Sequence, residues 1–413
     1  MRHCIKQFFE LQGYQVIGER LGENQEMILR IVKKGQADKC PDCGSKRLSI
    51  HQYAPWRLKK HSNFQEKLIY VEVGRNRLRC LKCRKVFSEE LPGIRKRERK
   101  TVNFIKQSLN YLSKNSFNEV GKVNQISYAP LKKQLYQFVN PYQLLDKKIE
   151  ELNKLDKIYL GLDGQSFRGN EMVLTVAEVK QRQLLTILPS EYQTDLLEFA
   201  DKMPLNLRAK VKGIAVDMTN KHKAVLKLCF PGALIVIDHY HVIQQAIMHM
   251  QKVRTAFQSA KRISIPIKNE LDKNYEDLGA DEKLKVLKYF ILFPELKEAY
   301  WIKERLRSLY RISRHRKATH KFKAIKNALL RSKEIEMREL GKTMANWEEE
   351  ILNYFNCRIT NAFTEGLHTK CKLIKRKSFG FRNVQTYIRK LILGIIPLIA
   401  ILSLHPLFTH LLT

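Results

Sequence analysis

The sequence predicts a multidomain α/β protein built around a mixed sheet, and three observations support this prediction. The chain has 413 residues, 44% of them hydrophobic, which is enough to bury the cores of roughly two to four domains. Residues 157–238 alternate short strand-like runs with helical runs, an order typical of a mixed sheet with parallel members. Residues 239–350 are helical in pattern over a length that no ordinary loop reaches, so we expect an inserted helical subdomain.

Two cysteine knuckles in the first hundred residues predict a zinc-binding module. Cys40 with Cys43, and Cys80 with Cys83, each form a CxxC turn, which lets two thiolates face one ion. Two such turns complete the tetrahedron of a structural zinc site and leave no open position for catalysis. Between them, residues 68–80 alternate apolar and polar positions like one arm of a hairpin. A redox CxxC and four unrelated buried thiols are the alternatives.

Residues 101–150 predict helices that read DNA. Ser116 is expected to cap a short helix, and after a break Ser127 is expected to cap a second helix over residues 128–138, with Pro130 in its first turn. Two short helices joined by a tight turn are typical of a helix-turn-helix, which places its second helix in a major groove. A plain helical core is the alternative.

Strand-like runs are recognised by β-branched and apolar residues between turn signals. They cover residues 15–17, 27–32, 157–163, 172–180, 183–189, 211–217 and 233–238. Helical runs at residues 195–203 and 221–230 separate the later strands, and a helical pattern resumes over residues 346–377.

The charge of the chain predicts its partner. Lys and Arg number 76 against 41 Asp and Glu, a formal net charge of +35, which self-repels unless a polyanion relieves it. Nucleic acid is the favoured polyanion and a membrane surface the second choice. Residues 391–408 carry no formal charge, but Pro397 and Pro406 interrupt them, so we favour a buried terminal segment over a membrane anchor.

The cysteines and the N-terminus favour the bacterial cytoplasm, in association with DNA. Eight Cys in a chain of this length are too sparse for a secreted disulfide scaffold. The N-terminal sequence lacks the unbroken apolar stretch of a signal peptide.

Three acidic residues predict a cation site. Asp163 and Asp217 are each expected to end an apolar strand, and Glu365 is expected on a helix. Acidic residues at strand ends are commonly solvated caps. Clustered carboxylates, however, are the oxygen ligands that Mg²⁺ prefers. Asp238 also ends a strand and is the main rival to Asp217.

These segments together resemble the ISL3 family of DDE insertion-sequence transposases, over residues from about 10 to 390. The segments that support the resemblance are CPDCGS, CLKCRKVFSEELPGI, LGLDGQSFRGN, VDMTNKHKAVLKLCFPGALIVIDHYHVI and TEGLHTKCKLIKRKSFGFRN. The resemblance implies a zinc-binding N-terminal module, a helix-turn-helix and a ribonuclease-H-like catalytic core interrupted by a helical insertion. The sequence departs from the family at two positions: Gly164 follows Asp163 in the first motif, Asp-Gly-Gln-Ser, where the family commonly has an acidic residue, and His368 stands where Asn is usual.

The resemblance also implies the roles of the site residues. Asp163, Asp217 and Glu365 would hold two Mg²⁺ or Mn²⁺ ions, with Asp163 as the bridge. The reaction would be water attack at the element end, then attack of the freed 3′-hydroxyl on target DNA. Basic residues beyond Glu365 would contact DNA phosphates, and a solvated helix face is the alternative for each. These are Lys370, Lys372, Lys375, Arg376 and Arg382.

The expected function is therefore a transposase that binds double-stranded DNA at element ends and target, as a homo-oligomer and without a membrane. A zinc-dependent DNA-binding regulator derived from an inactive transposase is the alternative, and a general ribonuclease-H-like nuclease is the third. His239 and His241 follow Asp238, and we expect them to pack or to contact DNA phosphate, with approach to the active site as the alternative. The expected domains are residues 1–100 (zinc module), 101–150 (helix-turn-helix), 151–238 with 346–390 (catalytic core), 239–345 (helical insertion) and 391–413 (apolar tail).

Overall fold

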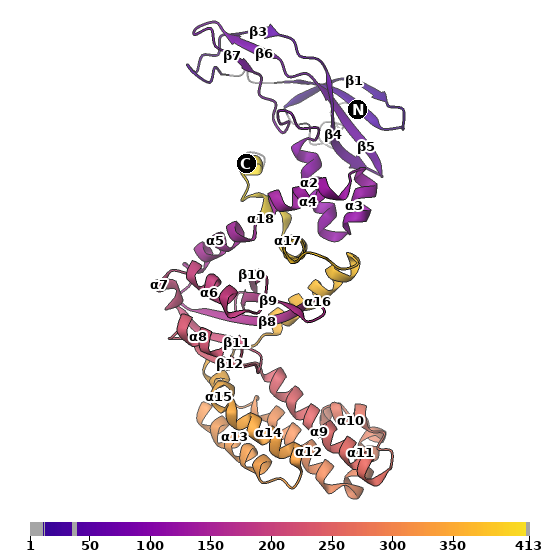
Figure 1. The fold of residues 1–413 in the computed structure, drawn as a ribbon, viewed down its shortest axis with the longest axis vertical. Helices are drawn as coiled ribbons and strands as arrows, with labels where there is room; N and C mark the ends of the chain where they lie inside the picture. Colours follow the sequence, from indigo (N-terminus) through magenta and orange to yellow (C-terminus); the bar gives the residue numbers. More distant parts are fainter. Residues whose placement is uncertain (1–10, 12, 35–38, 410–413) are drawn as a thin grey trace. The chain divides into compact units, whose positions relative to one another are not determined.

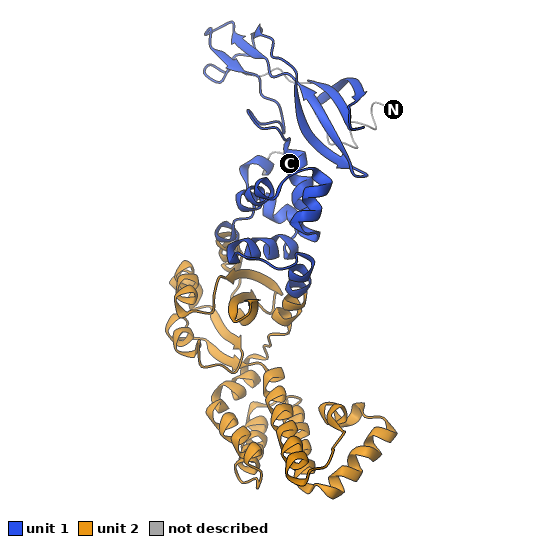
Figure 2. Cartoon of the chain, turned by 45° about the vertical axis from the view of Figure 1, so that its right-hand side comes forward, with its two compact units in different colours: residues 1–144, 370–413 blue, residues 145–369 orange. Residues whose placement is uncertain are grey.

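The computed structural model describes residue 11, residues 13–34 and residues 39–409 (Figure 1). The chain divides into two compact units (Figure 2). Residues 1–144 and 370–413 form the first unit, and residues 145–369 form the second.

The first unit opens with a four-stranded sheet in the order β1-β2-β5-β4. β1 and β2 form an antiparallel hairpin, β5 runs parallel to β2, and β4 is antiparallel to β5. Leu29, Ile31 and Val71 lie fully buried in its core. The two β-like runs predicted before residue 33 are thus confirmed as strands. The strands are β1 (Tyr14–Leu21), β2 (Met27–Lys33), β4 (Arg57–Phe64) and β5 (Lys67–Val73).

A second, three-stranded sheet holds the cysteine knuckles. It consists of antiparallel strands in the order β3-β6-β7. The single hairpin arm predicted over residues 68–80 is wrong, because β5 ends at Val73 and β6 belongs to this other sheet. The strand ends before Gly74. A side chain at this position would be crowded, because a Cβ would lie 3.0 Å from the Ala54 carbonyl oxygen. The strands are β3 (Leu48–Gln52), β6 (Arg77–Cys80) and β7 (Val86–Ser88).

Three packed helices follow, α2 (Val102–Lys114), α3 (Phe117–Asn124) and α4 (Tyr128–Phe138). Ser116 caps α3 as predicted: its Oγ accepts from Glu119 N at 3.2 Å, and Glu119 Oε2 accepts from Ser116 N at 2.8 Å. Ser127 stands at the N-cap of α4 but makes no side-chain capping hydrogen bond. The turn between α3 and α4 requires Gly121, since a Cβ there would lie 2.8 Å from the Ile126 carbonyl oxygen.

The apolar C-terminal segment packs into the first unit. α17 contacts α2 and α4, and the ring of Phe408 lies 5.5 Å from that of Phe138. Pro397 precedes α18 and Pro406 begins α19, so both prolines interrupt the helical run. Leu391, Leu402 and Phe408 are buried, which confirms the buried terminal segment. Within the described residues, no helix has the length and apolar character needed to cross a bilayer. The helices are α17 (Val384–Ile395), α18 (Leu398–Leu402) and α19 (Pro406–Thr409).

The second unit is built on a five-stranded mixed sheet in the order β10-β9-β8-β11-β12. β8, β9 and β10 are antiparallel in succession, while β11 runs parallel to both β8 and β12. The predicted mixed sheet with parallel members is confirmed. The strands are β8 (Ile158–Arg168), β9 (Glu171–Glu178), β10 (Gln183–Leu188), β11 (Val211–Val216) and β12 (Leu234–Ile237).

Both faces of this sheet are covered. Ile214 and Val216 of β11 lie in the large core that includes residues of α6, α8 and α9, whereas Ala215 faces Ile359 on the other side. The alternation follows from the two-residue period of a strand. The covering helices are α5 (Pro141–Leu152), α6 (Gln193–Lys202), α7 (Leu205–Arg208) and α8 (Lys223–Cys229).

A helical segment follows β12, as the sequence predicts. The helical pattern predicted over residues 346–377 is confirmed as two helices, because α15 ends at Cys357 and the next residue, Arg358, has a left-handed φ of 52°. Arg358 Nη2 donates to the Ser313 carbonyl oxygen at 2.9 Å. The next residue, Ile359, packs against the face of the sheet that carries Ala215. The elements are α9 (His239–Lys261), α10 (Lys268–Asp272), η1 (Tyr275–Asp277), α11 (Ala280–Leu292), α12 (Pro294–Leu309), α13 (His315–Leu330), α14 (Ile335–Asn346), α15 (Glu348–Cys357) and α16 (Ala362–Lys377).

Candidate active site

Asp163 lies within β8 and not at its end, so that part of the prediction is wrong. The strand continues to Arg168 because residues 160–168 stay paired with β9. The pairing with β11, however, ends at Gly161, opposite Ala215. Asp163 therefore lies just beyond the edge where the parallel pairing stops.

The parallel register brings three aspartates to one edge of the sheet. Gly161 pairs with Ala215, so two residues further on Asp163 is level with Asp217. Val216 pairs with Ile237, so one residue further on Asp217 is level with Asp238. Because parallel strands end at the same edge, all three carboxylates lie in one region of the sheet. The clustering predicted for Asp163 and Asp217 needs this arrangement.

Asp238 is held by backbone groups. Its carboxylate caps α9 by accepting from Tyr240 N at 2.9 Å, and it also accepts from the backbone N–H of Asn361. The side chain is only 1% exposed. Burial alone would raise the pKa of Asp238, but its hydrogen bonds with His239, Tyr240 and Asn361 outweigh burial and lower it. Asp238 thus acts as a structural tie between β12, α9 and the start of α16.

Asp217 is more open and pairs with a histidine. Its Oδ1 lies 2.7 Å from His241 Nε2, and its side chain is 32% exposed. This interaction, with the charges of Asp238 and Asp163, raises the pKa of His241 against the opposing effect of burial. His241 therefore approaches the acidic group, which was the alternative to packing or phosphate contact. His239 packs between the rings of Tyr310 and Tyr354.

Asp163 is buried beside a second histidine. His368 Nδ1 lies 3.1 Å from Asp163 Oδ2, and His368 Nε2 lies 3.0 Å from the hydroxyl of Thr175 on β9. His368 follows Glu365 by one helical turn, so α16 presents both side chains toward the sheet. His368, where Asn is usual in the family, therefore orients Asp163.

Glu365 joins the three aspartates electrostatically from the first turn of α16. Burial raises the pKa of its carboxyl, and the charges of Asp238, Asp163 and Asp217 raise it further, while His241 lowers it. Four acids that repel one another in this way favour a divalent cation, and all their ligand atoms are oxygen, which suits Mg²⁺. The chemistry of these donor atoms fits that ion. Within the described ranges, the carboxylates do not form a set whose ligand atoms all lie within 4.8 Å of one another, so they do not close a complete sphere.

Asn361 ties the start of α16 to β8 and to Asp238, and the sequence analysis did not identify it. Its side chain is fully buried, and its Nδ2 donates to the Leu162 carbonyl oxygen at 3.0 Å while its backbone N–H binds Asp238. A Cβ on Gly161 would lie 2.7 Å from Asn361 Oδ1, so β8 has a glycine where α16 begins. No motif marks this contact, because it joins residues almost two hundred positions apart.

Asn361→Ala is expected to lower the free energy of unfolding by about 1–3 kcal/mol, because the Leu162 carbonyl loses its buried donor. Thermal unfolding of the purified full chain measures this change. Thr369→Ala, an exposed substitution on the same helix, is the matched control and should leave the unfolding midpoint unchanged. Equal midpoints for both variants would contradict the positioning role of Asn361.

Glu191 is a further acid that the sequence did not reveal. It lies in the loop between β10 and α6, and a Cβ on Gly164 would overlap its carboxylate. Lys221 Nζ lies 3.3 Å from Glu191 Oε2. The glycine after Asp163 thus leaves room for this ion pair at the edge of the acidic group.

The basic residues predicted to bind DNA belong to the other compact unit. Lys372, Lys375 and Arg376 lie further along α16, and Arg382 lies in the loop before α17. Lys372, Arg376 and Arg382 are exposed, and Lys375 is half-buried. Lys370 is exposed as well.

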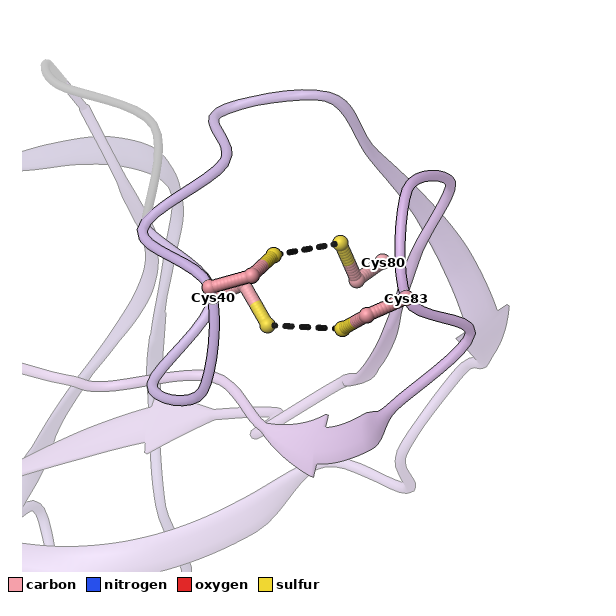
Figure 3. A group of neighbouring side chains, drawn as sticks. Cys40, Cys80 and Cys83 are labelled. Atoms are coloured by element: carbon pink, nitrogen blue, oxygen red, sulfur yellow. Dashed lines mark hydrogen bonds between the residues drawn. The ribbon is translucent and has the colours of Figure 1, made fainter.

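The four knuckle cysteines come together in the first unit (Figure 3). Cys40 Sγ lies 3.4 Å from Cys83 Sγ, Cys43 Sγ lies 3.6 Å from Cys80 Sγ, and all four atoms lie within 4.8 Å of one another. A tetrahedral zinc site with Zn–S bonds of about 2.3 Å places its sulfurs about 3.8 Å apart, so the donor set fits zinc.

The two knuckles have the same backbone geometry. Gly44 N donates to the Cys40 carbonyl oxygen, and Arg84 N donates to that of Cys80, both at 2.9 Å. Gly44 and Arg84 have left-handed φ values of 68° and 64°. In the second knuckle, the backbone N–H groups of Cys83 and Lys82 lower the pKa of the Cys80 thiol to about 6 against the opposing effect of burial, which favours the thiolate that metals bind.

Comparison with known proteins gives two matches. Residues 160–391 match the family model of DDE transposases of the ISL3 type, described as "Transposase". The chain is also similar to the transposase for insertion sequence element IS1001 of Bordetella parapertussis, with 21% identity over 396 residues, covering 92% of this chain and 95% of that protein. The family match spans the whole acidic group, from Asp163 to Glu365.

Proposed function

Because the chain belongs to the ISL3 family of DDE transposases, we propose that it binds the inverted-repeat ends of its insertion sequence and catalyses magnesium-dependent cleavage and strand transfer of DNA. One observation supports the catalytic part most strongly. The parallel register puts Asp163 level with Asp217, and Glu365 shares their electrostatic environment from α16. These three residues are the proposed magnesium ligands. Asp238 is left out because backbone groups already occupy its carboxylate.

The strand order supports a ribonuclease-H-like core for this site. Three antiparallel strands are followed by two strands parallel to the first, and helices α9 to α15 interrupt the chain before α16. In this proposal residues 151–238 and 346–390 form the core, and residues 239–345 are the helical insertion.

The chemistry places negative charge on the attacking and leaving oxygens of a phosphodiester. Bound Mg²⁺ ions supply Lewis-acid stabilisation of both oxygens and lower the pKa of water. Asp163, Asp217 and Glu365 would hold them, while His368 orients Asp163 and Asn361 fixes the start of α16. Water attacks at the element end and frees a 3′-hydroxyl, which then attacks target DNA without a covalent enzyme intermediate.

The first unit is the proposed reader of the element end. The zinc module of residues 1–100 and the helices α3 and α4 contact DNA, with α4 in a major groove as in a helix-turn-helix. Tyr128 and Lys133 are exposed on α4, so this helix offers side chains to a groove.

DNA affinity is expected to fall steeply with salt, because lysines and arginines replace condensed counterions on the phosphates. With about six phosphates neutralised, the affinity should fall about 10³-fold between 50 and 200 mM salt. Arg316→Ala, in the basic groove near the start of α13, should reduce the logarithmic salt slope by about 1. Lys342→Ala is the control, since this lysine already pairs with Glu339 at 2.8 Å. If Arg316→Ala left the salt slope unchanged, the proposal that the helical insertion contacts DNA phosphates would be contradicted.

Incubation of the full chain with DNA that carries the repeats flanking its own gene tests the function. With Mg²⁺, nicks are expected at the repeat ends, and with EDTA none. Equal binding to repeat-end and random DNA, without any nick, would contradict the proposal.

A further inference from the structure

An open cavity in the first unit has no part in the acidic site. Its volume is about 940 Å³, and it lies between the α3–α4 pair and the segment Ser378–Asn383. Phe117 and Tyr128 line it from the two helices, with their rings edge to face at 5.0 Å. Phe379 lines it from the segment and is 90% exposed.

The backbone fixes Phe379 in place. Phe379 N donates to the Arg376 carbonyl oxygen at 3.0 Å, and Gly380 N donates to that of Lys375 at 3.1 Å, which closes the end of α16. At the other end, Asn383 caps α17 and accepts from the Tyr136 hydroxyl at 3.0 Å. The turn therefore fixes the backbone from which the ring projects.

Phe379 is an unusual residue for this turn. Its φ of 56° is left-handed, a conformation that glycine and asparagine adopt far more readily than an aromatic residue. A single exposed apolar side chain needs no explanation by itself. A strained backbone beside an exposed aromatic ring at the mouth of a cavity does need an explanation, because backbone strain of this kind is concentrated at binding sites.

The polar lining defines the chemistry of the ligand. Lys122, Lys132 and Arg382 line the cavity, and its lining contains no acidic residue. Asn118 and Gln125 are exposed there, and within the described part of the chain their side chains make no hydrogen bond. Aromatic faces, free amides and cations are the groups that bind a nucleobase and its phosphate.

We propose that this cavity binds one unpaired nucleotide of DNA, with its base stacked on Phe379 and its phosphate near Arg382. The proposal rests on the proposed function, since it requires DNA to be bound by the first unit. A base that has left the duplex stack fits such a site, whereas a paired base keeps both faces covered by its neighbours. The cations in the lining, which no acidic residue of the lining opposes, favour an anionic nucleotide over a neutral peptide.

The test compares two DNA duplexes of one repeat-end sequence, one fully paired and one with a single bulged 2-aminopurine. The full wild-type chain is expected to bind the bulged duplex about 5-fold to 100-fold more tightly, the range that one stacked base provides. Phe379→Ala should lose this preference, and Phe379→Trp should keep it. Leu373→Ala, which removes another exposed apolar side chain outside the cavity, is the matched control.

Fluorescence of the bulged base gives a second readout. Stacking on the ring should quench 2-aminopurine in the wild-type and Phe379→Trp complexes and leave it bright in the Phe379→Ala complex. Equal affinities of wild type and Phe379→Ala for the bulged duplex, with equal fluorescence, would overturn the proposal while leaving the proposed function intact. Failure of the wild type to bind either duplex would overturn both.

Discussion

Asp163→Ala is expected to lower cleavage of repeat-end DNA by about 10³-fold or more while DNA binding stays within about twofold. The physical reason is that a lost ligand removes several kcal/mol of transition-state stabilisation, and each 1.36 kcal/mol is a factor of ten. The proposed phosphate contacts, which would supply most of the affinity, involve other residues. A cleavage assay and a binding assay on the same purified protein measure the two quantities.

Two further variants separate chemistry from folding. Asp163→Asn keeps the shape of the side chain beside His368 and should lose cleavage equally, as should Glu365→Ala. Asp201→Ala removes an acid that pairs with Arg208 and is 75% exposed, so its activity should match that of the wild type. An Asp163→Asn protein that folds and cleaves like the wild type would remove Asp163 from the site.

The second large effect concerns the cysteine cluster. Cys80→Ser is expected to lower bound zinc from one equivalent to less than about half, and to unfold the module around β3, β6 and β7. Binding free energies of structural zinc, about 10–16 kcal/mol, far exceed the stability of a three-stranded sheet of this size. Metal analysis and limited proteolysis of the full chain measure both effects.

A buried cysteine of the second unit supplies the control. Cys229→Ala should keep full zinc content, because this thiol lies in the core near α8 and not in the cluster. Protein purified without chelators and found to lack zinc, yet resistant to proteolysis over residues 39–100, would contradict the metal assignment.

Parts of both compact units could be predicted from the sequence because their signals are local. The strand-like runs at residues 172–180 and 183–189 leave two residues between them, a spacing typical of a tight turn, and Arg182 there has a left-handed φ of 53°. The capping box at Ser116 was similarly readable, since Ser116 and Glu119 are three residues apart. Short-range patterns of this kind depend little on the rest of the fold.

The contacts that the sequence did not reveal join distant parts of the chain. Asn361 reaches Leu162 and Asp238, and Glu191 sits over Gly164 from another loop. In the sequence, the choice of Asp217 over Asp238 rests on the resemblance to the family, because both acids follow buried strands; the tertiary hydrogen bonds of Asp238 are a second difference that the sequence does not reveal. Hydrophobic periodicity carries no information about these pairings.

The central claim is tested most directly by cleavage assays of Asp217→Asn beside Asp238→Asn, on folded protein with repeat-end DNA and Mg²⁺. Asparagine is a good N-cap, so Asp238→Asn should keep the start of α9 and retain metal-dependent cleavage, with a lower unfolding midpoint from the altered contact with Asn361. Asp217→Asn should bind the DNA and leave it intact. Robust Mg²⁺-dependent cleavage by Asp217→Asn, with loss of cleavage in Asp238→Asn, would contradict the account and move the second acid to Asp238.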